Sequence, residues 1–158
     1  MIAATATKIE DLTLNISEEI HVKAPLDVTF DTLLEQLGPL MGGAEDRAMP
    51  MKIEPWPGGR WYRDLGDNNG HCWGHVQAIK RPFLIEFYGP LMMSYPVASN
   101  VQYRLTEEAG GTLIKFHHTA IGVIQDDHRQ GFPKGWSYIH AKAKERAEAP
   151  RVGRTSTR

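Results

Sequence analysis

The sequence predicts a single α+β domain in which a curved antiparallel sheet packs against one C-terminal helix. Three observations predict this fold: the order of the elements, the change of apolar spacing along the chain, and the length. A strand and a helix come first, short strands separated by turns fill residues 51–121, and one helix follows Gly131. A chain of 158 residues is as long as one typical compact domain.

The first strand and the first helix differ in the period of their apolar residues. Residues 12–22 alternate apolar and polar side chains with one slip at 17–19, which predicts a half-buried strand. Pro25 ends that strand, and apolar side chains at helical spacing predict an amphipathic helix over 27–37. Gly38, which a proline follows, stops this helix or separates it from a second short helix.

From residue 51 the apolar period is two, and glycine, proline and asparagine separate the apolar segments. The sequences Asp-Asn-Asn-Gly at 67–70 and Glu-Ala-Gly-Gly at 108–111 are strong turn signals. Local turns between consecutive strands predict an antiparallel meander. The expected strands are 51–54, 60–64, 71–80, 83–88 with Phe83, Ile85 and Phe87 on one face, a strand through Val101, Tyr103 and Leu105, and 112–121.

The last helix is expected over residues 134–148, because Gly131 and Pro133 interrupt a helix that starts earlier. Its inward stripe consists of Trp136, Ile139, Ala143 and Ala147. The lower part of this stripe is alanine. The helix therefore either approaches the sheet closely or leaves space beneath it.

The composition is that of an ordinary globular protein, with 41% apolar and 23% charged residues. A formal net charge of -1 cannot hold a phosphate backbone, so nucleic acid is not an expected partner. No segment approaches the roughly 18 apolar residues of a membrane span, and the N-terminus lacks the pattern of a secretory signal. Because Cys72 is the only cysteine, no internal disulfide can form, and the expected location is the cytoplasm.

Several short segments, taken in order along the chain, carry a resemblance to a known family. They are residues 20–30, 57–61, 74–76, 80–82 and 112–118, and the pairs Gly131-Phe132 and Gly135-Trp136. In this order the sequence resembles the START-like superfamily, also called SRPBCC or helix-grip. Within that superfamily it is most similar to the homologues of the activator of the heat-shock-protein-90 ATPase, the AHSA family. The resemblance covers residues 12–148.

The resemblance implies a curved sheet of six or seven antiparallel strands around a long C-terminal helix, with two short helices after the first strand. Residues 12–148 would form one START-like domain, residues 1–11 an N-terminal extension, and residues 149–158 a disordered tail. Members of the superfamily form an apolar pocket between sheet and helix, and they include lipid carriers, hormone sensors and aromatase or cyclase enzymes. The fold alone therefore does not determine the function.

Eight side chains are candidates for contacting a ligand in such a pocket, and most are aromatic, although aromatics also fill the cores of small domains. His118 is in register with Ile114 and Phe116 and is expected to face the cavity. There it either binds a ligand carbonyl, acts as a base, or is a core histidine bonded to a backbone carbonyl or water. Arg63 either pairs with an acidic ligand group or lies at the surface. The candidates are Trp61, Arg63, Phe87, Tyr103, Phe116, His118, Phe132 and Trp136.

Neither a metal site nor a catalytic group is expected. His117 and His118 are neighbours on a strand and point to opposite faces. His71 and His75 would lie about 13 Å apart at about 3.3 Å per residue, too far for one ion. The chain has no phosphate-binding glycine loop and no nucleophile motif. No cofactor and no catalytic residue is assigned.

The favoured function is the binding or sequestration of a small apolar or amphipathic molecule in the internal cavity, without turnover. Two alternatives stay open. One is a cyclase- or hydrolase-like enzyme that uses His118 as acid or base. The other is an interaction module that binds a chaperone or another protein through its outer surface. The apolar connection 89–96 is either a lid over the pocket or a contact in a homodimer.

Overall fold

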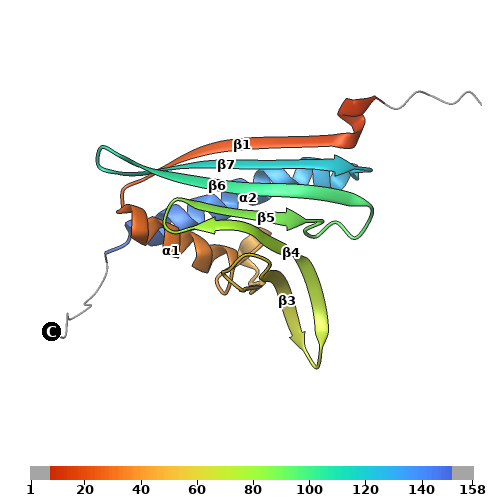
Figure 1. The fold of residues 1–158 in the computed structure, drawn as a ribbon, viewed down its shortest axis with the longest axis horizontal. Helices are drawn as coiled ribbons and strands as arrows, with labels where there is room; N and C mark the ends of the chain where they lie inside the picture. Colours follow the sequence, from red (N-terminus) through yellow and green to blue (C-terminus); the bar gives the residue numbers. More distant parts are fainter. Residues whose placement is uncertain (1–7, 151–158) are drawn as a thin grey trace, which may run out of the picture.

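The computed structural model describes residues 8–150, which form one antiparallel sheet with two α-helices on one of its faces (Figure 1). The strand order is β1-β7-β6-β5-β4-β3-β2, so the first strand lies beside the last and the others form a meander. The strands are β1 (Thr13–Val22), β2 (Lys52–Ile53), β3 (Arg60–Gly66), β4 (Asn69–Lys80), β5 (Leu84–Gly89), β6 (Val97–Glu108) and β7 (Gly111–Gly122). The predicted α+β helix-grip fold is confirmed.

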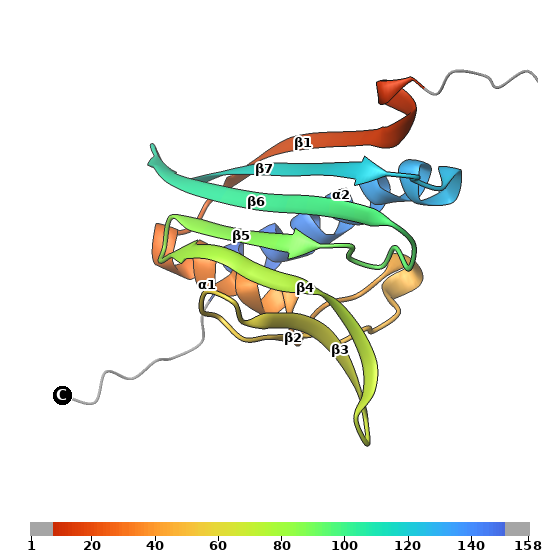
Figure 2. The same ribbon diagram turned by 45° about the vertical axis from the view of Figure 1, so that its right-hand side comes forward.

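The two α-helices, α1 (Leu26–Leu37) and α2 (Asp126–Glu148), lie side by side behind the sheet, and the β3–β4 hairpin extends beyond them (Figure 2). Of the two short helices expected after the first strand, the first is α1. The second is a single turn of 3-10 helix, η2 (Ala44–Asp46). Neither α1 nor α2 is both long and apolar enough to cross a membrane.

The sequence predicts an extension at the N-terminus and a disordered tail at the C-terminus. Residues 8–11 of the expected N-terminal extension are described, and a 3-10 turn, η1 (Ile9–Leu12), leads into β1. Residues 1–7 and the segment 151–158 of the expected disordered tail lie outside the described residues. The domain limits 12 and 148 stay a prediction.

The slip in the apolar pattern at residues 17–19 does not interrupt β1. Its register with β7 is continuous from Thr13 to Val22. Alternation therefore continues through the strand, and Glu18 occupies an inward position between Ile16 and Ile20. The polar residue interrupts the apolar pattern but not the strand.

Helix α2 begins at Asp126, not near Lys134 as the sequence suggested. Pro133 lies inside the helix and has no N–H to donate to the Arg129 carbonyl, so one helical hydrogen bond is missing. Burial of Phe132 and Trp136 on either side of this position offsets that loss. Local helix-breaking signals were therefore overridden by packing against the sheet.

Phe83 does not share the buried face of Ile85 and Phe87 as expected. It lies in the turn before β5, and 46% of its surface is exposed. The cis Arg81-Pro82 peptide belongs to this turn.

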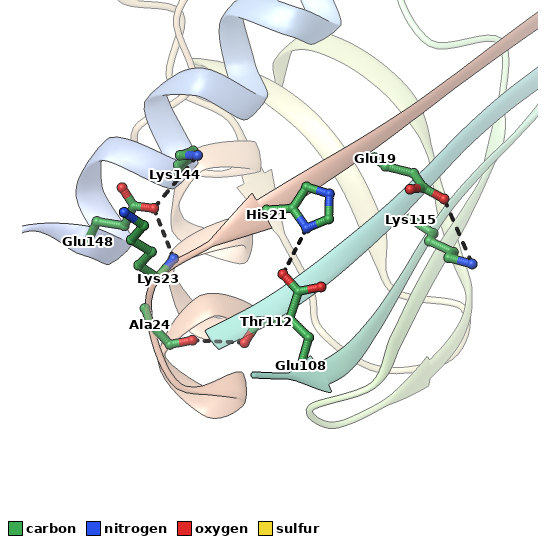
Figure 3. A network of polar contacts seen from close by, with 9 residues as sticks. All are labelled: Glu19, His21, Lys23, Ala24, Glu108, Thr112, Lys115, Lys144 and Glu148. Carbon is green, nitrogen blue, oxygen red and sulfur yellow. Dashed lines mark hydrogen bonds and ion pairs between the residues drawn. The ribbon is translucent and has the colours of Figure 1, made fainter. Parts of the chain in front are cut away.

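Polar contacts attach both helices to the sheet at their C-terminal ends. The Trp61 indole of β3 donates to the Leu37 carbonyl at 2.9 Å, which satisfies one of the free carbonyls at the end of α1. At the end of α2, Glu148 accepts the Lys23 backbone N–H at 2.9 Å, and its carboxylate lies 3.8 Å from Lys144 Nζ (Figure 3). The two helices are therefore fixed relative to β1 and β3.

We expect Gly74→Ala to destabilise the fold by about 1–3 kcal/mol, because overpacking a tight contact carries that cost. A Cβ at this position of β4 would overlap the carbonyl oxygen of Tyr88 on β5. Gly43→Ala is the matched control, since a Cβ there meets no atom within 4 Å. Urea denaturation of both variants checks this, and equal stabilities would contradict the steric account.

Candidate functional site

A cavity of about 220 Å³ lies between the N-terminal half of α2 and three other parts of the chain. These parts are the segment 41–49 after α1, Trp73 of β4, and Met92 of the β5–β6 loop. Most of the lining side chains are apolar. The lining residues are Met41, Gly42, Gly43, Met49, Trp73, Met92, His128, Gly131, Phe132, Gly135, Trp136, Tyr138 and Ile139.

Helix α2 supplies both the apolar wall and the open space. Phe132, Trp136 and Ile139 are buried and line the cavity. Gly131 and Gly135 are one turn apart and therefore share a face of the helix. A Cβ added at either position would meet no atom within 4 Å. Both glycines line the cavity and are exposed, and the space beside each is open to a larger side chain.

The segment 41–49 covers one side of the cavity and is attached to α2. Its ends pair with each other, with Met49 N–H donating to the Met41 carbonyl at 3.0 Å. The Tyr138 hydroxyl of α2 donates to the Asp46 carboxylate, and Lys142 Nζ lies 3.6 Å from the same carboxylate. The Tyr138 hydrogen bond, followed by the Lys142 charge, lowers the pKa of Asp46. An ionised Asp46 therefore holds this segment against the helix.

The β5–β6 loop forms another side of the cavity. Leu91 and Met93 are fully buried, whereas Met92 lines the cavity and is 40% exposed. Together with Met41 and Met49, it gives the wall three flexible thioether side chains. Methionine adapts its shape to different partners more readily than branched side chains do.

Of the eight sequence candidates, two line the cavity, five lie in the core behind it, and Arg63 lies in neither. Phe132 and Trp136 line the cavity. Trp61 and Phe87 are fully buried and pack on each other, with ring centroids 4.5 Å apart. Arg63 is on the β3–β4 hairpin, opposite His71 and outside this cavity. The other three, Tyr103, Phe116 and His118, lie in the layer between the sheet and α2.

His118 has a hydrogen-bond partner on each of its two ring nitrogens. The Trp136 indole can only donate, so its 3.1 Å contact makes His118 Nδ1 the acceptor. The ring proton of neutral His118 is therefore on Nε2, which donates to Ser99 Oγ at 3.2 Å. Burial, and to a smaller extent the nearby His117, lowers the pKa of His118 to about 4. The imidazole is neutral at pH 7, and both of its nitrogens have partners.

A second set of connected hydrogen bonds contains a histidine and a carboxylate that the sequence analysis did not assign. His140 Nδ1 lies 2.8 Å from Glu18 Oε2, and His140 Nε2 lies 3.0 Å from the Tyr103 hydroxyl. Burial lowers the pKa of His140, and the hydrogen bond to Glu18 opposes this shift. Burial, with the Glu18 charge, raises the pKa of Tyr103. These hydrogen bonds connect α2 to β1 and β6.

Two sequence signals could have identified some of these residues. Glu18 has the same parity as Leu14, Ile16 and Ile20, which places it on the inner face of β1 if the strand is regular. The glycines at 131 and 135 have helical spacing and flank Phe132. No local pattern connects Met41, Trp73 and Met92, because three separate segments supply them.

The buried polar side chains that have hydrogen-bond partners lie apart from the cavity, whose wall is mostly apolar. His118 is hydrogen-bonded to Trp136 and Ser99, His140 and Tyr103 are hydrogen-bonded to each other, and none of the three histidine and tyrosine side chains lines the cavity. Within residues 8–150, no three His, Cys, Asp or Glu side chains come together as a metal site would require. The chemistry that the cavity wall offers is burial of an apolar surface with a few polar contacts.

A family model described as activator of Hsp90 ATPase homolog 1-like protein matches residues 47–148. No curated protein matches the chain. Among solved structures, a protein from Rhizobium leguminosarum has 19% identity and a TM-score of 0.66, covering 86% of this chain and 95% of its own. Ara h 8.0201 has 14% identity and a TM-score of 0.63, covering 84% of this chain and 96% of its own.

A two-domain protein is also similar. The di-domain ARO/CYC StfQ from the steffimycin biosynthetic pathway has 13% identity and a TM-score of 0.62. The similarity covers 89% of this chain and 52% of StfQ. At these identities the solved structures show a shared fold alone.

We expect acid to weaken the fold between pH 6.5 and pH 4. The unfolded chain protonates His118 near the ordinary pKa of 6.5, whereas the buried ring in the folded chain stays neutral down to about pH 4. The unfolded state therefore binds more protons across this window, and stability falls as the pH falls. The contribution of His118 should be about 3 kcal/mol.

Urea denaturation at a series of pH values measures this contribution. His118→Gln is the informative variant, since its amide can accept from Trp136 and donate to Ser99 but does not titrate. Its stability should depend less on pH than that of the wild type over the same window. Parallel pH profiles for the two proteins would show that His118 titrates normally in the folded state.

We expect Glu18→Ala to lower the free energy of unfolding by about 1–3 kcal/mol, because buried His140 loses the acceptor of its Nδ1 proton. The neighbouring Glu19 provides the control. It points to the outer face, 3.8 Å from exposed Lys115, so Glu19→Ala should change stability by less than about 0.5 kcal/mol. Similar losses in both variants, measured in urea, would contradict an internal role for Glu18.

Proposed function

The chain belongs to the activator of Hsp90 ATPase homolog 1-like family and has the START-like helix-grip fold, and from this we propose that it binds a small molecule in the cavity beneath α2. The molecule is apolar or amphipathic and is released unchanged. The single observation that carries the proposal is the preformed, mostly apolar cavity with open space at Gly131 and Gly135. Removing the apolar surface of a ligand from water supplies the binding free energy, about 25 cal/mol per Å².

Binding without turnover fits the wall of the cavity better than catalysis does. An acid or base catalyst must come within hydrogen-bond reach of the substrate. His118, the residue that the enzyme hypothesis requires, is fully buried behind Trp136 and has partners on both nitrogens. We therefore rank a cyclase- or hydrolase-like activity below ligand binding.

An interaction module that binds a chaperone through its outer surface has less support than ligand binding. That hypothesis expects a contiguous apolar patch and little internal space. The large exposed apolar side chains lie on separate parts of the chain, such as Trp56, Leu65 and Val123, and the cavity is present. The single Cys72 favours a reducing compartment, so we infer that the ligand is bound in the cytoplasm.

We expect Gly131→Leu and Gly135→Leu to abolish ligand binding while the protein stays folded. Leucine at either position extends into the open space at the cavity and displaces no neighbouring atom at its Cβ. Replacing glycine in a helix also raises stability by about 1 kcal/mol, so lost binding cannot be ascribed to unfolding. The alanine variants at the same positions gain helix propensity but leave most of the space open.

Two measurements on the full chain check this expectation. Native mass spectrometry of gently purified protein detects any bound small molecule, and an NMR titration with the bicyclic hydrocarbon tetralin measures binding directly. Wild type and the alanine variants should bind tetralin, with chemical-shift changes at residues lining the cavity. Unchanged binding by both leucine variants would place the ligand elsewhere and overturn the proposal.

A further inference from the structure

The wall of the cavity contains a buried hydrogen-bond donor that has no acceptor. Trp73 is 3% exposed, and its indole N–H donates to no protein atom in residues 8–150. Gln36 Oε1 is the one fully enclosed side-chain nitrogen or oxygen in these residues that has no partner. The Trp73 N–H is therefore not fully enclosed, and the open space that Trp73 lines is the cavity.

His128 provides a second donor on the same wall. The Tyr95 hydroxyl accepts the Gln125 backbone N–H at 3.1 Å and lies 2.7 Å from His128 Nδ1. The hydroxyl can still donate its own proton, and Nδ1 of a neutral ring can accept it. The proton of the neutral imidazole is then on Nε2, which has no partner in the described part of the chain. Tyr95 is thus a positioning residue that orients the His128 ring.

The cavity has hydrogen-bond donors in excess of acceptors. The other polar groups on the wall are occupied, since the Trp136 N–H binds His118 and the Tyr138 hydroxyl binds Asp46. None of the lining residues is Lys, Arg, Asp or Glu. A carboxylate would be buried there without a lysine or arginine partner, which is unfavourable. An uncharged acceptor oxygen on the ligand fits these groups best.

The volume limits the size of the ligand. A cavity of about 150 Å³ is large enough for benzene, whereas pockets for drug-sized ligands start at about 300 Å³. The volume here, about 220 Å³, lies between these limits. It suits a molecule of one or two rings and is too small for a sterol or a long acyl chain.

We propose that the cavity selects an uncharged carbonyl compound of one or two rings, whose carbonyl oxygen accepts hydrogen bonds from Trp73 Nε1–H and His128 Nε2–H. The ring system lies against Phe132, Trp136 and Met41. An apolar ligand of the same size leaves both donors without partners, which weakens its binding relative to the ketone. This inference rests on the proposed function of the cavity.

The test compares three ligands that share one ring system: tetralin, the ketone α-tetralone, and the anion 1,2,3,4-tetrahydro-1-naphthoate. Dissociation constants are measured by NMR titration of the full chain at pH 7.5. The readout is the ratio of the tetralin constant to the α-tetralone constant. In Trp73→Phe this ratio should fall roughly tenfold, the effect of one lost hydrogen bond. Trp56→Phe, at an exposed tryptophan outside the cavity, should leave the ratio unchanged.

A spectroscopic measurement on the wild type keeps the inference testable if Trp73→Phe does not fold. The infrared carbonyl band of bound α-tetralone should move to lower frequency than in an apolar solvent, because its oxygen accepts hydrogen bonds. Gly135→Leu should remove the shifted band by blocking the cavity. Tighter binding of the naphthoate than of the ketone would overturn the choice of an uncharged ligand.

The outcomes separate this inference from the function on which it rests. If none of the three ligands binds, the proposed function fails and the inference fails with it. If tetralin binds, the ratio is the same in Trp73→Phe as in wild type, and the carbonyl band is unshifted, the inference alone is wrong. A reduced ratio with a shifted band supports both.

Discussion

The Trp136 side chain holds helix α2 in one rotation against the sheet. Its indole N–H donates to His118 at 3.1 Å, and its ring packs on Phe116 with centroids 4.9 Å apart. With its rotation fixed at this point, the helix has defined residues on the face toward the sheet and on the face toward the cavity. Gly131 and Gly135 then border the cavity, and His140 meets Glu18 on the strand β1. One aromatic contact thus determines both the open space and the internal polar contacts.

The molecule divides its polar groups between two environments. Behind Trp136, buried side chains are paired with polar partners, as in the contacts of His118 with Ser99 and of His140 with Glu18. Satisfied buried groups of this kind specify one arrangement of helix and sheet, because any other arrangement leaves them without partners. In front of Trp136, the wall is mostly apolar, and it includes Trp73 and His128, the two donors that the proposed ligand would use. The same helix therefore contributes buried hydrogen bonds on one face and lines the cavity on another.

The cavity is built from loops attached to a regular frame. The fold recurs in solved structures of less than 20% identity, such as Ara h 8.0201 and StfQ. The segment 41–49 and the β5–β6 loop supply Met41, Met49 and Met92. Loops of this kind vary more readily than the elements they connect. We therefore expect ligand preference to follow these two segments and the fold to follow the strands.

Local periodicity was sufficient to predict the meander, the helix α1 and the C-terminal helix, because alternation and helical spacing are properties of short segments. Alternation along β1 also places Glu18 on the inner face, although Glu18 itself is polar and so interrupts the apolar pattern. The start of α2 could not be predicted in this way. Gly131 and Pro133 oppose a helix locally, and only burial of Phe132 and Trp136 against the sheet outweighs them. The cavity is likewise a property of the folded chain, since its wall comes from segments that are distant in the sequence. Whether the Trp73 N–H has a partner also depends on the atoms that surround it in the folded chain.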